Sequence, residues 1–173
     1  MNTGNATRFL LALAASLTLW ATVGTSEPGD VRPIEKVYVD RSGVVHVVPA
    51  GGGDRKVRKE KDQTGTWMLR SSEDQSTVGW LAEFNNCCTS YPIPLRLVIY
   101  RNGKVRRRFG DGMMIYDWRF WAEGKQAAFC SGTVRGDSGG HCELHDINTG
   151  KTLDAIDARS DENSPQWARG LIN

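Results

Sequence analysis

Short runs of β-branched and aromatic residues, separated by turn sequences, recur along most of this chain. Runs of this length favour strands, and a turn sequence between two of them favours a β-hairpin. No long Ala-, Leu- and Glu-rich helical pattern follows the N-terminal segment, and 19 of the 173 residues are glycine. The chain is therefore expected to be all-β and built from antiparallel hairpins. The runs span residues 37–39, 44–48, 95–100, 105–109, 113–121, 126–130, 142–146 and 152–156.

The clearest hairpin joins residues 95–100 to residues 105–109 through Asn102-Gly103. Asn-Gly supplies the positive φ angles that a type I′ turn requires. A two-residue loop places Ile99 opposite Arg106 and Val98 opposite Arg107, so each face mixes aliphatic and arginine side chains. Residues 50–65, with three consecutive glycines and a charged run, predict a solvated loop or a marginal edge strand instead.

The N-terminal segment has the pattern of an export signal. Arg8 precedes an almost wholly apolar run over residues 9–20, and small residues at 21–26 offer a cleavage site. The run is too short to span a bilayer comfortably, so no membrane span is expected. We interpret residues 1–25 as a signal peptide, residues 26–33 as a linker and residues 34–173 as a single β domain, exported to a periplasmic or extracellular compartment.

The overall charge is close to neutral, at a formal +2 for the whole chain. This balance gives no global attraction to nucleic acid or to an anionic membrane, so binding to a polyanion requires a local patch. No nucleic-acid partner is expected.

Four cysteines, Cys87, Cys88, Cys130 and Cys142, allow three disulfide connectivities. Cys130 and Cys142 flank a Gly-rich segment, and if that segment is a hairpin tip their sulfurs face each other across two strands. Cys87 and Cys88 leave an extended strand on opposite faces, so a bond between them needs a strained turn. They are either free, or one of them reaches a neighbouring strand.

A weak repeat accompanies the hairpins, because Trp80, Trp118 and Trp167 each open a segment. Residues 118–129 followed by residues 142–151 resemble one WD-like propeller repeat of the TolB type, with a Trp, a short strand, a Gly-Lys turn, a second strand and a third strand closing on Asp-x-x-Thr-Gly-Lys. The resemblance covers about 40 residues well and implies propeller-like blades. A closed propeller needs about four blades, whereas this chain has material for roughly three units. The alternatives are an open meander, a small sandwich or barrel, or an assembly that covers the open edges.

The string Gly-Asp-Ser-Gly-Gly at residues 136–140 matches the surroundings of the nucleophile in chymotrypsin-like serine proteases. It defines one alternative function, a serine hydrolase with Ser138 as nucleophile and His141, His145 or His46 as base. The motif that carries the base in that family is absent, and about 150 residues is short for two barrels. A Gly-rich hairpin tip is the expected structure.

His141, Glu143 and His145 alternate along one predicted strand, so all three side chains leave by the same face. This spacing defines a second alternative, a metal-binding module. At about 3.3 Å per residue, however, the two histidines start roughly 13 Å apart, too far for one ion at about 2 Å from each ligand. A solvated polar face is expected here, with no metal and no cofactor.

Two features are candidates for binding. The basic clusters at residues 55–61 and 101–108, the second of which includes Arg106 and Arg108, form an anion-binding patch if the fold brings them together. The alternative that we favour is solvated surface charge. In that case the clusters are balanced by the acidic residues Asp154, Asp157, Asp161 and Glu162. Aromatic residues Trp118 and Phe120 fall on one face of a strand and Tyr116 and Trp121 on the other. At least one set is expected to be core, and an exposed set is a contact surface.

The sequence thus predicts an exported, non-catalytic binding or scaffold protein of unknown ligand. The residues expected to contact the ligand are Trp118, Phe120, Trp121, Arg106 and Arg108. The expected partner is another protein, or a second copy that joins through open sheet edges.

Overall fold

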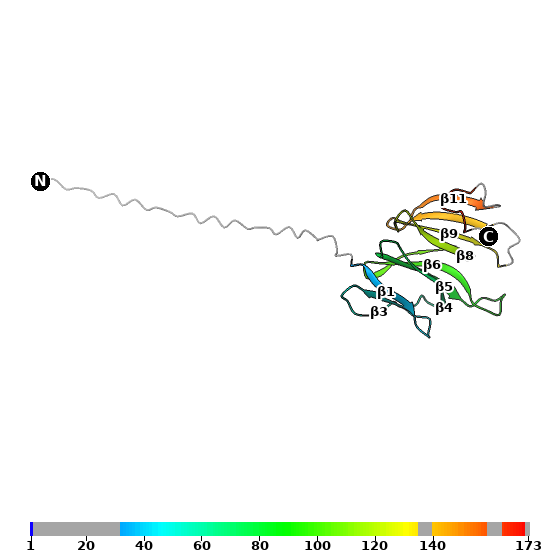
Figure 1. Ribbon diagram of the computed structural model, residues 1–173, viewed down its shortest axis with the longest axis horizontal. Helices are drawn as coiled ribbons and strands as arrows, with labels where there is room; N and C mark the ends of the chain where they lie inside the picture. Colours follow the sequence, from blue (N-terminus) through cyan, green and yellow to red (C-terminus); the bar gives the residue numbers. More distant parts are fainter. Residues whose placement is uncertain (2–31, 135–139, 159–163, 172–173) are drawn as a thin grey trace.

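The computed structural model describes residues 1, 32–134, 140–158 and 164–171. Every regular element in these residues is a strand, and the eleven strands form three antiparallel sheets (Figure 1). Sheet A consists of β1 (Ile34–Val39), β2 (Val45–Pro49) and β3 (Arg55–Lys56). Sheet B consists of β4 (Gln63–Ser71), β5 (Thr77–Phe84), β6 (Ile93–Arg101) and β7 (Lys104–Phe109). Sheet C consists of β8 (Met114–Trp121), β9 (Gln126–Gly132), β10 (Gly140–Asp146) and β11 (Thr152–Ala158).

Within each sheet, strands that follow one another in sequence are neighbours. Sheets B and C therefore have the four-stranded antiparallel meander of a propeller blade, and sheet A is a three-stranded version of it. The expectation of an all-β chain with about three blade-like units is confirmed. Apart from residue 1, the proposed signal peptide lies outside the described residues, as do most of the proposed linker and residues 136–139 of the Gly-Asp-Ser-Gly-Gly string, which include Ser138.

The three sheets stack face to face, with sheet B in the middle (Figure 1). Trp80 and Val98 from sheet B pack with Val45 and Val47 from sheet A. The next residues along β5 and β6 point the other way and pack with sheet C. Six consecutive residues of β5, from Thr77, are buried, which is the pattern of a strand covered on both faces.

The outward faces of the two terminal sheets differ. The outward face of sheet A is polar and carries Tyr38 and His46, whose rings are stacked with centroids 4.6 Å apart. The outward face of sheet C is covered by residues 164–171, whose Trp167, Ala168 and Leu171 form a buried cluster with the sheet. The segment that Trp167 opens thus covers the third unit.

A missing side chain sets the contact between sheets B and C. The indole of Trp118 is fully buried and lies over Gly79 of β5, where an added Cβ would come within 2.5 Å of Cη2. The indole Nε1 donates a hydrogen bond to the carbonyl of Met68, 2.9 Å away. Glycine is therefore required at this position because the ring occupies the space of its side chain.

Two sequence expectations need correction. In the hairpin of β6 and β7, Ile99 pairs with Arg107 and Val98 with Arg108, because a β-bulge inserts Arg106 next to the turn and shifts the register by one residue. Strand β4 was not expected at residues 63–71, because Gly65 and the charged residues before it do not favour a strand. The strand is also irregular, since Met68 has a positive φ. Residues 50–65, expected to be a solvated loop or a marginal edge strand, contain the two-residue edge strand β3.

The Gly-rich segment before Cys142 does join two paired strands. Cys130 of β9 and Cys142 of β10 are directly opposite each other in the ladder, and a disulfide connects them. Both residues are buried under Trp167 and Leu171. In the residues that the structure describes, no helix has the length and apolar character needed to cross a bilayer.

Candidate functional site

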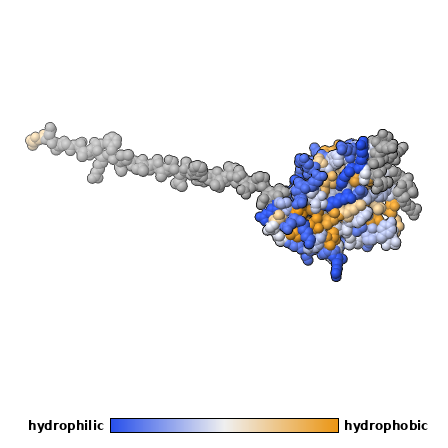
Figure 2. Space-filling view, viewed as in Figure 1, coloured by the Kyte–Doolittle hydropathy of each residue, from blue (hydrophilic) through white to orange (hydrophobic). Residues whose placement is uncertain are grey.

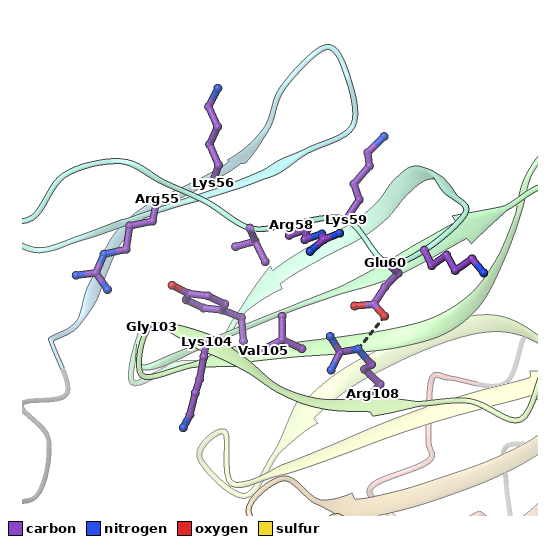
Figure 3. Close-up of a pocket in the computed structure, with 12 residues that line it drawn as sticks. Arg55, Lys56, Arg58, Lys59, Glu60, Gly103, Lys104, Val105 and Arg108 are labelled. Carbon is purple, nitrogen blue, oxygen red and sulfur yellow. Dashed lines mark hydrogen bonds and ion pairs between the residues drawn. The ribbon is translucent and has the colours of Figure 1, made fainter.

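A groove of about 880 Å³ separates residues 55–61 from the hairpin of β6 and β7 (Figure 3). One wall is β3 and the segment that follows it, and the other is β7 with the end of β6. The two basic clusters of the sequence thus lie on opposite sides of one groove, although they are separated by about forty residues of chain. Its lining consists of residues 55–61 together with Tyr100, Gly103, Lys104, Val105 and Arg108.

The floor of the groove is apolar and belongs to the core. Val57 and Tyr100 are both buried in the cluster between sheets A and B, and Val105 packs against that cluster. The amide of Val57 donates to the carbonyl of Val45, 2.8 Å away, which fixes the segment after β3 to sheet A. The groove is therefore held in shape by packed residues on both sides rather than by loops alone.

The side chains of the wall divide into engaged and available cations. Lys59 donates to the carbonyls of Ser42 and Thr64, and so holds the turn of the first hairpin. Glu60, the single carboxylate of the groove lining, receives Arg108 Nε at 2.7 Å. Arg96 contributes a second, longer ion pair to the same carboxylate, at 3.7 Å.

Four further cations of the lining are available to a ligand, whereas Lys56 points away from the groove (Figure 3). Among the described residues none forms an ion pair with Arg55, Arg58, Lys61 or Lys104, and all four are exposed. Figure 3 shows Arg55 reaching from β3 toward the end of the hairpin, where its Nη1 lies 3.1 Å from the position of a Cβ on Gly103. Figure 2 shows strongly hydrophilic residues that border an apolar area on the face of the domain in view.

The acidic residues that the sequence offered as internal partners are engaged elsewhere. Asp154 accepts a hydrogen bond from Nε1 of Trp167 at 2.8 Å, and Asp157 contacts Nδ1 of His141 at 2.8 Å. Both belong to β11 of sheet C, whereas the groove lies between sheets A and B. Asp161 and Glu162 are outside the described residues. The balance expected between the basic clusters and Asp154 and Asp157 is therefore not formed.

The residues expected to make contacts are dispersed. Trp118 is fully buried, so it is core and not a contact residue. Phe120 and Trp121 are half-buried and line a separate small pocket of about 490 Å³ on sheet C. Arg108 is in the groove, while Arg106 is exposed in the bulge and lines another depression together with Asn148. Tyr100 and Val57 of the groove floor were not expected from the sequence, since their burial depends on the packing of sheet A on sheet B.

His46 is held between two carboxylates on the outward face of sheet A. Its Nδ1 contacts Asp54 at 2.8 Å and its Nε2 contacts Asp40 at 3.1 Å. The hydrogen bond to Asp54, followed by that to Asp40, raises the pKa of His46 above its ordinary value. Because a carboxylate lies at each ring nitrogen, this imidazole is not a free base for a nucleophile.

His141, Glu143 and His145 leave β10 by one face, as the alternation predicts. Glu143 lies between the histidines, with Oε2 2.8 Å from Nε2 of His145 and Oε1 3.4 Å from Nε2 of His141. His145 is buried against Phe109 and Phe129, so this part of the face is not solvated as expected.

The ring nitrogen of His145 that faces away from Glu143 lies near one hydroxyl. Thr152 Oγ1 is 3.5 Å from His145 Nδ1, too long for a pair of nucleophile and base. Across the described ranges, no group of three or more His, Cys, Asp or Glu side chains has the arrangement of a metal site.

Two solved structures to which the chain is similar are β-propeller domains. The chain is similar to the C-terminal WD40 domain of Sif2, with a TM-score of 0.47 and 11% identity over 72% of this chain and 34% of that one. It is also similar to the β-propeller domain of Cps50 (Swd1) from Myceliophteria thermophila, with a TM-score of 0.43 and 12% identity over 73% of this chain and 40% of that one. The chain therefore spans between a third and two fifths of these domains. No protein-family model and no curated protein matches it.

Proposed function

We propose that this chain is an exported, non-catalytic binding protein whose basic groove receives an acidic, extended segment of a partner protein. The observation that carries the proposal is the convergence of two basic clusters on one groove in which Glu60 is already paired. Arg55, Arg58, Lys61 and Lys104 are left without an internal counterion among the described residues.

Charge supplies most of the expected recognition. A single exposed ion pair is worth only about 0–1 kcal/mol, so one cation alone defines no site. Four cations around one concave surface add their fields, which raises the association rate of an acidic partner and selects against a basic one. The near-neutral charge of the whole chain makes this attraction local to the groove.

The two walls favour an extended occupant. β3 and β7 are edge strands of their sheets, so each has one row of backbone groups without a partner strand. An added strand satisfies such groups, and side chains that alternate along it place apolar residues on the floor and carboxylates at the rim. Val57 and Val105 on the floor suit small aliphatic side chains, so we infer a ligand in which acidic and aliphatic residues alternate.

A nucleic acid fits this groove less well. Proteins that bind single strands combine a basic groove with exposed aromatic rings on which bases stack. The aromatic residue of this groove, Tyr100, is only 5% exposed and is part of the core. Protein is therefore the class of partner that we propose, and nucleic acid becomes an outcome of the test.

Export and the lack of catalysis belong to the same proposal. Residues 1–25 serve as signal peptide and residues 26–33 as linker, and the buried disulfide between Cys130 and Cys142 suits an oxidising compartment. Catalysis is not proposed because His46 is paired at both nitrogens and His145 has no hydroxyl within normal hydrogen-bond distance.

Fluorescence anisotropy with a labelled peptide of alternating Glu and Val tests the function. The charge-reversal variant Arg55→Glu/Arg58→Glu should weaken binding by at least about tenfold, since four unit charges change next to the ligand. The matched control Lys125→Glu/Lys151→Glu, which makes the same change on sheet C, should weaken it less than about threefold. A scrambled peptide of equal charge separates alternation from charge alone.

Three results would contradict this proposal. Equal weakening by both variants means that the peptide senses net charge and not the groove. Tighter binding of a single-stranded oligonucleotide, lost in Arg55→Glu/Arg58→Glu, assigns the groove to nucleic acid. A dimer in light scattering that the same variant dissociates assigns it to self-association.

A further inference from the structure

The loop between β5 and β6 brings two neighbouring thiols together. Cys87 and Cys88 are both exposed, and their sulfur atoms are 2.6 Å apart. Atoms that only touch rest about 3.5–4.0 Å apart, whereas the sulfurs of a disulfide are about 2.05 Å apart. The two sulfurs therefore lie side by side and within reach of a bond.

The side chain of Asn86 creates this arrangement. Its Oδ1 accepts hydrogen bonds from the amides of Cys88 at 2.7 Å and Thr89 at 3.0 Å. An asparagine that binds the backbone two residues ahead folds the chain into a tight turn. In an extended strand the two cysteine side chains would leave on opposite faces, but in this turn they meet.

The other two cysteines of the chain form a separate, buried pair. Cys130 and Cys142 are already bonded, and each is at most 1% exposed. Thiol–disulfide exchange needs access of a thiolate to the sulfur that it attacks. Reagents in solution therefore meet Cys87 and Cys88 in the folded protein and not the buried disulfide.

We propose that Cys87 and Cys88 form a redox-active dithiol site that closes to a vicinal disulfide by exchange with a small organic disulfide. One thiolate attacks a sulfur of the organic disulfide and releases a first thiolate, which leaves a mixed disulfide on the protein. The neighbouring thiolate then attacks the protein sulfur of that mixed disulfide and releases the second thiolate. The protein loses two protons and two electrons, and the organic disulfide is reduced to two thiols.

The hydrogen bond and the charge interaction with Cys87 raise the pKa of Cys88, because the two thiols lie side by side. The proposal is independent of the basic groove, since neither cysteine lines it.

The test starts from folded protein in which Cys87 and Cys88 are reduced. This protein is incubated with oxidised glutathione, quenched with acid and analysed by mass spectrometry. Cleavage after Arg70 and Arg96 releases residues 71–96, which contain Cys87 and Cys88 and no other cysteine. The expected product is this peptide lighter by two hydrogens, with no glutathione attached. Persistent addition of one or two glutathiones, or a disulfide-linked dimer, would overturn the proposal.

Two variants sharpen the result. Cys88→Ser should stop at the mixed disulfide, with one glutathione on Cys87. Asn86→Ala keeps both thiols but removes the turn, so ring closure after the first exchange should slow by about tenfold or more. An unchanged rate in Asn86→Ala would show that adjacency in sequence, rather than the fold of the loop, brings the sulfurs together. Capture of the reduced pair by a trivalent arsenical, lost in Cys88→Ser, provides an independent readout.

Discussion

The contact between Gly79 and Trp118 makes a quantitative prediction about the interface of sheets B and C. In Gly79→Ala the new methyl group would lie 2.5 Å from Cη2 of the indole and 2.9 Å from Cδ1 of Ile99. Overpacking of a close-packed core costs about 1–3 kcal/mol, and the lower entropy of the unfolded alanine chain returns about 0.4–1 kcal/mol. The net loss of unfolding free energy should be about 1–2 kcal/mol, which lowers Tm by about 3–6 °C.

A double-mutant cycle tests whether the indole is the cause. Trp118→Leu alone removes the ring and its hydrogen bond to Met68, and should cost about 2–4 kcal/mol. In that background only the contact with Ile99 Cδ1 remains, so Gly79→Ala should cost clearly less than in the parent protein, and the coupling energy should be about 1–2 kcal/mol. Urea unfolding followed by far-ultraviolet circular dichroism measures all four proteins without relying on tryptophan fluorescence.

The control and the refuting result are both available in the same chain. Gly53→Ala adds a methyl group with nothing within 4 Å, so its effect should stay within about 0.5 kcal/mol. The account of the interface is refuted if Gly79→Ala costs no more than Gly53→Ala, or if its cost is the same with and without Trp118.

Three further predictions concern stability. Replacing both Cys130 and Cys142 by alanine should lower the unfolding free energy by about 2–4 kcal/mol, measured by urea denaturation, because the bond closes a loop of twelve residues' separation in the unfolded chain. Because the pKa of His46 is raised in the folded state, its protonation stabilises the fold fully below the ordinary pKa of 6.5, and this stabilisation is lost as pH rises through the folded-state pKa. When Tm is measured from pH 6 to about 9, it should therefore decline less steeply in His46→Gln than in the parent protein. Trp167→Ala should uncover the outward face of sheet C, with a loss of about 3–5 kcal/mol and increased binding of a hydrophobic dye; an unchanged dye signal would show that residues 164–171 are not the cover of that face.

The sequence predicts most of the strands because their signals are local. Asn102-Gly103 determines a hairpin through its own φ angles of 53° and 77°, whatever the rest of the chain does. The register of the same hairpin is not local, since Val105 packs toward sheet A and Phe109 toward sheet C. The bulge at Arg106 satisfies both contacts, and no pattern within residues 95–109 announces it.

The candidate site shows the same division. Both basic clusters are visible as charge runs, but their convergence depends on sheet A stacking on sheet B, which no spacing encodes. The aromatic strand was expected to offer a contact face, yet Trp118 is buried because Gly79 on another sheet leaves room for it. The contact between Cys87 and Cys88, by contrast, depends on a local signal. Asn86 precedes the two cysteines and favours a turn, so the sequence could have indicated that their sulfurs lie on the same side.

The stacking order has a consequence for how the molecule comes apart. Sheet A and sheet C each pack against sheet B, so that β5 in the middle of the stack is buried from both sides over six consecutive residues. Such an array behaves as a one-dimensional chain of nearest-neighbour couplings. Opening should therefore start at either terminal unit and move inward, and the amide protons of β5 should be the last to exchange with solvent.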